Sequence, residues 1–162
     1  MDNKKLSNKH EQYIAKVLGG KTQIASGAIP LVGMKGDVVT KDFLIECKAT
    51  AKSYYNLKRK VVEKIEKEAL KCGRVPLLAI RTSIGDFILY RNADFFNDDA
   101  EIDMVCKESL KLTDSLLSNI QTSDPELFRV MAPCIQIRER KWCLVDIDIF
   151  KKCLMWGVLY GY

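Results

Sequence analysis

The sequence lacks several features that would place this chain in common classes of protein. It holds one histidine, and none of its six cysteines forms a Cys-x-x-Cys pair. This scarcity argues against a structural zinc site and indicates reduced, mostly buried thiols. No apolar run approaches the ~20 residues that cross a bilayer. The first residues, MDNKKLSNK, do not form a signal peptide. Together these absences favour a cytoplasmic protein that does not insert into a membrane.

The composition is that of an ordinary soluble globular protein, with 48% hydrophobic and 29% charged residues. The charge is unevenly distributed. Residues 1–74 hold 16 Lys and Arg against 8 Asp and Glu, whereas the rest hold 10 against 13, giving net charges of +8 and −3. The basic part favours a polyanionic partner, and nucleic acid over membrane because no basic amphipathic helix accompanies it. The alternative is a solvated lysine-rich surface.

Hydrophobic periodicity and turn residues predict an α/β fold in which a mixed central sheet is flanked by helices. The predicted helices cover 8–18, 55–72 and 104–121, with a further short helix or turn at 124–125. A β-hairpin is predicted at 37–48 and two strands at 76–81 and 87–90, while 21–35 is a strand or loop and 92–103 a loop. Glycines at 19–20 and 73 are placed to end the first two helices.

The second half of the chain echoes the first. Pro76-LLAIR followed by FILYRNADF resembles Pro133-CIQIR followed by WCLVDIDIF. These segments are either two hairpins of one extended sheet or a core and an addition, and we favour the second interpretation. It predicts a core at 1–95 and a C-terminal α/β extension at 96–162 packed on that core, with a single compact domain as the alternative.

The hairpin at 37–48 carries the chemistry. If Lys41-Asp42 is a two-residue turn, paired residue numbers sum to 83 and Asp37 lies opposite Glu46. Opposed Cβ atoms are roughly 4.5–5.5 Å apart, and two carboxylates that close repel each other unless a cation lies between them. Lys48 points from the same face as Glu46. Two acids and an ammonium on one face suit divalent-metal hydrolysis.

Magnesium ions are usually held by one or two carboxylates together with waters and substrate phosphate. Asp37, Glu46 and the backbone carbonyl of Cys47 fit that description. Glu46 directly follows the apolar run Phe43-Leu44-Ile45, a setting in which a carboxylate without a partner is rare. The alternative is a pair of solvated surface carboxylates. Lys48 either neutralises the two acids or positions water and offsets charge on phosphorus.

Other residues have competing explanations. Glu11 is either the acid of a capping box that begins at Asn8 or a metal ligand from the first helix. His10 is interpreted as a surface histidine. Tyr54 and Tyr55 are either packing anchors or contacts to a nucleic-acid backbone. The lysine-rich segments suggest a DNA-binding set: Lys4, Lys5, Lys9, Lys35, Lys52, Lys58, Arg59 and Lys60.

The ordered set Glu11, Gly36-Asp37 and Glu46-Cys47-Lys48 resembles the PD-(D/E)xK nuclease superfamily, with Gly36 in place of the proline. Residues 8–91 are most similar to the archaeal-type Holliday junction resolvases. The matching pieces are Glu11, Ser26-Gly27, the string Ile45–Thr50 and the strand Pro76–Arg81. The resemblance covers about half of the chain and implies a restriction-endonuclease-like core.

The resemblance implies a homodimer that nicks four-way DNA junctions in pairs with Mg²⁺, or Mn²⁺ in its place, in a prokaryotic cell or the host cell of a virus. It assigns catalysis to Glu11, Asp37, Glu46 and Lys48, with Asp37, Glu46 and Glu11 near the metal. Ser26 is a further candidate, although the arginine usual beside it is absent here. Two alternatives stay open: a restriction-like, nicking or repair endonuclease acting on duplex DNA, and a non-catalytic DNA-binding protein.

Overall fold

The computed structural model describes residues 3–23, 36–95, 101–121 and 132–155, and the following account concerns these residues. The helices are α1 (Asn3–Leu18), α2 (Arg59–Lys71), α3 (Asp114–Gln121) and α5 (Ile147–Met155), with a 3₁₀ turn, η1, at Asn92–Asp94. The strands are β1 (Lys21–Thr22), β2 (Val38–Val39), β3 (Phe43–Ala49), β4 (Tyr55–Lys58), β5 (Val75–Arg81), β6 (Asp86–Arg91), β7 (Met104–Val105), β8 (Ser109–Leu112), β9 (Cys134–Ile137) and β10 (Arg140–Asp146).

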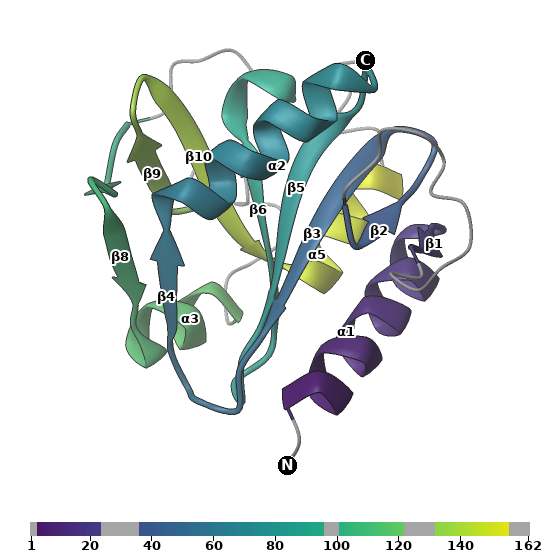
Figure 1. The fold of residues 1–162 in the computed structure, drawn as a ribbon. Helices are drawn as coiled ribbons and strands as arrows, with labels where there is room; N and C mark the ends of the chain where they lie inside the picture. The colour runs from purple at the N-terminus through teal and green to yellow at the C-terminus, as the bar shows by residue number, and fades with distance from the viewer. Residues whose placement is uncertain (1–2, 24–35, 96–100, 122–131, 156–162) are drawn as a thin grey trace.

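A mixed sheet forms the centre of the molecule (Figure 1). Within the described residues it has eight strands in the order β1-β2-β3-β5-β6-β10-β9-β7, and β4 pairs with β8 in a separate ladder. The β3–β5 pair is parallel and is connected through α2, whereas the β2–β3 and β5–β6 pairs are antiparallel. The predicted fold class, a mixed sheet flanked by helices, is confirmed.

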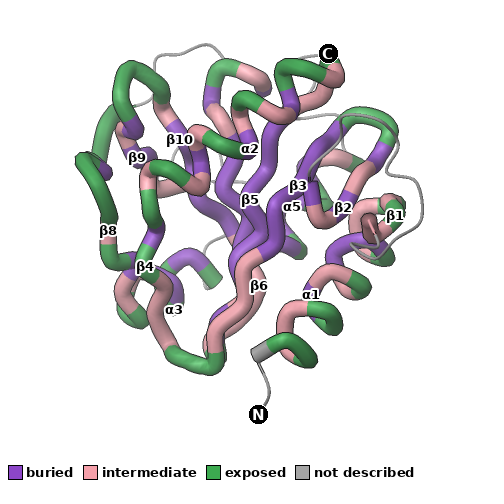
Figure 2. The backbone as a smooth tube through the Cα atoms, in the orientation of Figure 1, coloured by how far each residue is buried: buried purple, intermediate pink, exposed green. Residues whose placement is uncertain are grey.

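The two faces of the sheet bury different helices. Alternate residues of β3 separate the faces, so Ile45 packs with Ile14 of α1 and with Phe150 of α5. On the other face, Leu78 and Leu144 pack with α2 and α3. The central strands are accordingly buried, while the outer surfaces of the helices are exposed (Figure 2).

The two echoing hairpins belong to the same sheet. β10 pairs with β6 from Trp142–Arg91 to Asp146–Phe87, and β9 pairs with β10. Residues beyond 95 therefore continue the central sheet at the side away from β2. The division into a core at 1–95 and an extension stays a prediction.

The helix predicted at 8–18 begins earlier in the structure, at Asn3, and two other predicted helices begin later. The segment 104–121 is helical only from Asp114, because Ser109–Leu112 forms β8 and pairs with Tyr55–Lys58. For the same reason the helix predicted at 55–72 begins at Arg59. In both segments a tertiary pairing partner overrides the local helical pattern. Of the segment 21–35, predicted as a strand or loop, Lys21–Thr22 forms β1 and residues 24–35 lie outside the described residues, as does the start of the helix or turn predicted at 124–125.

Glycine ends both α1 and α2, as predicted. Gly19 and Gly73 have φ values of 68° and 62°, the left-handed conformation that follows many helix C-termini. All six cysteines are free thiols and all except Cys72 are buried, which also agrees with the prediction. Among the described residues, no helix is both long enough and apolar enough to cross a membrane.

Candidate active site

The β2–β3 hairpin has the predicted register. The Thr40 N–H donates to the carbonyl oxygen of Phe43 over 3.0 Å, which closes a two-residue turn at 41–42. Val38 pairs with Ile45 and the next pair follows in step, so paired residue numbers sum to 83. The register places Asp37 at the end of this ladder, beside Glu46.

Glycine rather than proline precedes Asp37 for a steric reason. Gly36 is buried, and a Cβ atom there would lie 2.7 Å from Cδ1 of Leu44 and 3.2 Å from the carbonyl oxygen of Ile45. A side chain at this position would require the buried Leu44 side chain to move and the β3 backbone to shift slightly, so glycine allows the close approach of the two strands.

Asp37 is held at the edge of β3. Its Oδ2 accepts the backbone N–H of Cys47 over 2.7 Å, at the point where the regular β2 ladder has ended. Burial raises the pKa of the Asp37 carboxyl, the Cys47 hydrogen bond opposes this, and the charge of Glu46 raises the pKa further. A carboxylate whose charge is disfavoured by burial and by a neighbouring acid is one that a bound cation would relieve.

Glu46 is buried between two ammonium groups. Nζ of Lys48 donates to its Oε1 over 2.7 Å, and Nζ of Lys64 lies 3.4 Å from each of its oxygens. The side chain of Glu46 is 6% exposed, against 35% for Lys48 and 51% for Lys64. Burial lowers the pKa of Lys48, but the hydrogen bond and charge of Glu46 outweigh it, so the pKa is raised and the group stays cationic.

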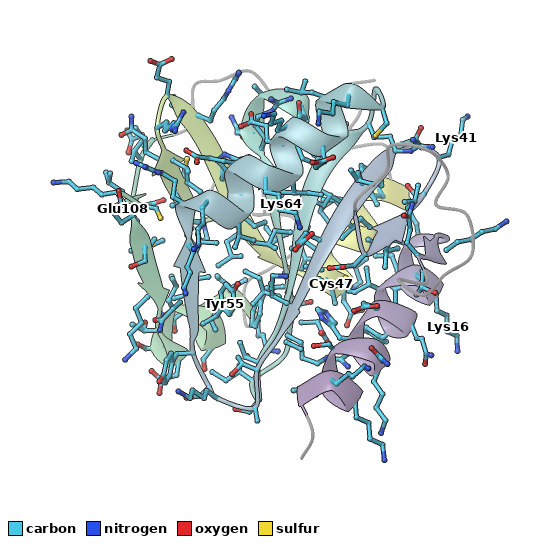
Figure 3. All side chains as sticks on the ribbon, viewed as in Figure 1. Lys16, Lys41, Cys47, Tyr55, Lys64 and Glu108 are labelled. Carbon is cyan, nitrogen blue, oxygen red and sulfur yellow. The ribbon has the colours of Figure 1, made fainter. Side chains whose placement is uncertain are left out.

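Lys64 is absent from the predicted site. It lies on α2, and Figure 3 shows it on the sheet side of that helix, near β3. The alternation of β3 explains where Lys64 lies. Glu46 is on the same face of β3 as Leu44, and Leu44 packs against Ile65 and Ala69 of α2. The sequence itself offers many lysines and marks none of them.

Glu11 approaches the same cluster from α1. Because α1 begins at Asn3, Asn8 lies inside the helix and cannot be its N-cap, so the capping-box explanation is wrong. Burial raises the pKa of Glu11, Asp37 and Glu46 raise it further, and Lys48 opposes them. The charge of Glu11 thus interacts with the charges of the hairpin acids and of Lys48.

The prediction for Glu11 follows from this coupling. Glu11→Gln preserves shape and removes a negative charge beside Asp37 and Glu46, so we expect the affinity of this cluster for Mn²⁺ to fall by roughly tenfold to a hundredfold. The melting temperature should be unchanged or higher, because an ionised group with a raised pKa destabilises the fold at neutral pH. Gln12→Ala, at the exposed neighbouring position, is the control. Calorimetric titration measures the Mn²⁺ affinity, and an affinity unchanged by Glu11→Gln would remove Glu11 from the site.

His10 is fully buried, which contradicts its interpretation as a surface residue. Its Nε2 lies 3.3 Å from Oδ1 of Asp86, close enough for an ion pair but not aligned as a hydrogen bond. Asp86 also accepts two 2.8 Å bonds from Arg81, which lies over the ring of Tyr13. These contacts tie α1 to the β5–β6 hairpin and thereby help to position Glu11.

The predicted DNA-binding residues are not grouped in one place. Lys4, Lys5 and Lys9 are exposed on α1. Lys52 in the loop before β4, Lys58 on β4 and Lys60 on α2 are exposed as well. Arg59 is partly buried and contacts Glu63 and Glu108, each over 3.4 Å. Ser26 and Lys35 lie outside the described residues.

Tyr54 and Tyr55 have different surroundings. Tyr55 packs against the hydrophobic core that includes Val62 of α2. Burial raises the pKa of Tyr55, the charge of Lys48 lowers it and that of Glu46 raises it. Tyr55 therefore borders the candidate site. The Tyr54 hydroxyl oxygen accepts a 3.1 Å hydrogen bond from Nζ of Lys52, and Nζ of Lys111 lies 4.4 Å from the Tyr54 ring centroid. Lys111, on β8, is a second basic residue that the sequence did not indicate.

The carboxylates present suit a hard divalent cation. Among the described residues, no three His, Cys, Asp or Glu side chains form a group that could by itself hold a metal ion. Mg²⁺ ordinarily needs only one or two carboxylates, since waters and substrate phosphate complete its oxygen shell. Asp37 and Glu46 are the two carboxylates that the register brings side by side, and as a magnesium donor set they stay a prediction, with Glu11 as nearby charge. The Cys47 carbonyl as a ligand stays a prediction.

Comparison with known proteins gives a limited result. No protein-family model matches the chain, and no curated protein matches it. Among solved structures, it is similar to the 1.6 Å structure of Hjc from Archaeoglobus fulgidus, described as a Holliday junction resolvase from an archaeal hyperthermophile. The two share 13% identity over 70% of this chain and 89% of that chain, with a TM-score of 0.44. A likeness at this level assigns neither a family nor an activity.

Proposed function

We propose that this protein is a metal-dependent DNA endonuclease that resolves four-way junctions by paired phosphodiester nicks. The observation that carries the proposal is the hairpin register, which brings Asp37 beside Glu46 with Lys48 bonded to Glu46. Burial of Glu46 sets this cluster apart from a solvated surface pair. The +8 net charge of residues 1–74, which include the cluster, supports a polyanionic substrate.

Each residue has a distinct part in the proposed reaction. Asp37 and Glu46 would hold the cation, which when bound would supply Lewis acidity toward the phosphodiester and make water a better nucleophile. Lys48, oriented by its 2.7 Å bond to Glu46, places a fixed positive charge where negative charge develops on the phosphoryl oxygens. Glu11 adds a carboxylate that orients water or completes the cation shell.

The decisive experiment compares a four-way junction with a linear duplex of the same sequence in the presence of Mg²⁺. Symmetric nicks near the centre of the junction are expected. Equal cutting of the duplex would instead identify a restriction-like, nicking or repair endonuclease. Tight binding without any cutting would identify a non-catalytic DNA-binding protein. Paired nicks also require two active sites, so we propose a homodimer, which sedimentation analysis of the free protein tests.

Lys52 and Lys111 are expected to bind the DNA backbone beside the active site. They flank the accessible ring of Tyr54, which directly precedes Tyr55 at the border of the site. In the double variant Lys52→Ala/Lys111→Ala, loss of two phosphate contacts should lower the slope of log affinity against log salt by about 1.8. The turnover number at saturating DNA should be unchanged.

Binding at several salt concentrations, measured by fluorescence anisotropy, tests this prediction. A matched control is Lys151→Ala/Lys152→Ala, which removes two exposed lysines from α5, the helix that covers the opposite face of the sheet. An unchanged salt slope in the first double variant, or an equal loss in the second, would contradict a contact at Lys52 and Lys111.

A further inference from the structure

The helix α2 directs a lysine at the buried acid of the site. Lys64 reaches both oxygens of Glu46 at 3.4 Å, whereas Lys48 makes one short 2.7 Å bond to Oε1. Lys48 is therefore the close partner of the carboxylate and Lys64 a longer, looser one. The half-exposed Lys64 side chain also has solvent on one side, so its ammonium is free to move outward without unpacking the core.

The rotation of α2 about its own axis is fixed by contacts on its other sides. Glu66 contacts Arg91 over 2.9 Å and Arg140 over 3.2 Å, which ties the helix to β6 and β10. Val62 and Ile65 are buried against the sheet. Because these contacts hold Glu66, Val62 and Ile65 in place, α2 keeps residue 64 over β3. The contact between Lys64 and Glu46 therefore follows from the packing of the helix.

We propose that Lys64 is, after Lys48, a second cationic side chain of the active site. It neutralises Glu46 before the metal ion binds and contacts the substrate phosphate afterwards. The proposal rests on the nuclease function proposed above for its second half only. A divalent cation on Glu46 repels an ammonium that shares the same two oxygens. The displaced, half-exposed Nζ then lies beside the site at which a phosphodiester must enter, and a phosphate oxygen is the partner of opposite charge available there.

This arrangement has opposite consequences for the two ligands. Lys64 competes with the metal ion for Glu46, so its removal should strengthen metal binding. Lys64 attracts the phosphate, so its removal should weaken DNA binding. A lysine that merely stabilises α2 would change neither affinity in this paired manner, and a general loss of fold would weaken both.

The test uses Lys64→Met in the full chain, with Lys67→Met as the control at an exposed position one turn along α2. In calorimetric titrations with Mn²⁺ and no DNA, Lys64→Met should bind the ion about threefold to tenfold more tightly than the unmodified protein. In anisotropy titrations of a four-way junction with Ca²⁺ present, its affinity should fall by about threefold to tenfold and its salt slope by about 0.9. Lys67→Met should change neither quantity.

Lys64→Arg keeps the charge and should restore both affinities toward the unmodified values, which excludes a folding defect. Unchanged or weaker Mn²⁺ binding by Lys64→Met overturns the competition, and unchanged junction affinity overturns the phosphate contact. Because the Mn²⁺ titration contains no DNA, tighter metal binding in a protein that cuts no DNA would support the Lys64–Glu46 competition while the nuclease proposal itself failed.

Discussion

Lys48→Ala is expected to lower kcat for junction cleavage by roughly a hundredfold to a thousandfold while junction binding survives. Nζ of Lys48 forms the shortest contact to Glu46 and stays cationic because that contact raises its pKa. The substitution removes the fixed positive charge at the proposed reacting phosphate, while the other basic residues of the surface are untouched. Single-turnover cleavage with saturating protein measures the chemical step separately from binding.

The matched control is Lys41→Ala, which removes an exposed lysine from the turn of the same hairpin. It should cleave at the unmodified rate. Circular dichroism tests whether Lys48→Ala stays folded when Lys64 is the remaining described ammonium partner of the buried Glu46 carboxylate. A folded Lys48→Ala protein with full cleavage activity would contradict the active-site assignment.

Asp37→Asn should abolish detectable cleavage. In the absence of metal it should also raise the melting temperature by about 2–4 °C, the shift that roughly 1 kcal/mol of added stability gives in a chain of this size. The Asp37 pKa is raised by burial and by the charge of Glu46, so the ionised form opposes folding. Asparagine removes that charge and its carbonyl oxygen can still accept the Cys47 N–H. Thermal denaturation with EDTA and with Mg²⁺ measures both effects.

The pH dependence of this difference has a definite sign. A carboxyl whose folded-state pKa is raised favours the fold below its unfolded value, near 3.8 for Asp37, and this contribution is lost as pH rises through the folded-state pKa. The advantage of Asp37→Asn should therefore be largest at neutral pH and vanish toward acid. Mg²⁺ should stabilise the unmodified protein and not the variant. Asp42→Asn, at the exposed turn, is the control; an equal Mg²⁺ effect on Asp37→Asn would exclude Asp37 as a ligand.

Local pattern was sufficient for the elements that have strong internal signals. The hairpin at 37–48 was predicted together with its register, since the two-residue turn and alternate apolar residues specify which residues face each other. Strands 76–81 and 87–90 were predicted for the same reason, and glycine ended α1 and α2 where expected. These features depend on neighbours a few residues away.

Local pattern failed where a distant segment supplies the partner. Leu110 fits the helical pattern of the segment 104–121, but its strand, Ser109–Leu112, pairs with Tyr55–Lys58, which also shortens the helix predicted to begin at 55. His10 was interpreted as exposed because a single polar residue in a helix carries no signal about what packs over it. In the structure it lies against Asp86 of β6.

The sequence by itself determined the acidic hairpin of this protein: the spacing of Asp37, Glu46 and Lys48 and the turn between them place the three groups together. Only the tertiary structure decided which other charges join them. The start of α1 at Asn3 excluded the capping role of Glu11, and the packing of α2 brought Lys64 to Glu46. The physical reason is that a β-turn sets register locally, whereas the side of a helix that meets a given strand depends on long-range burial and ion pairing.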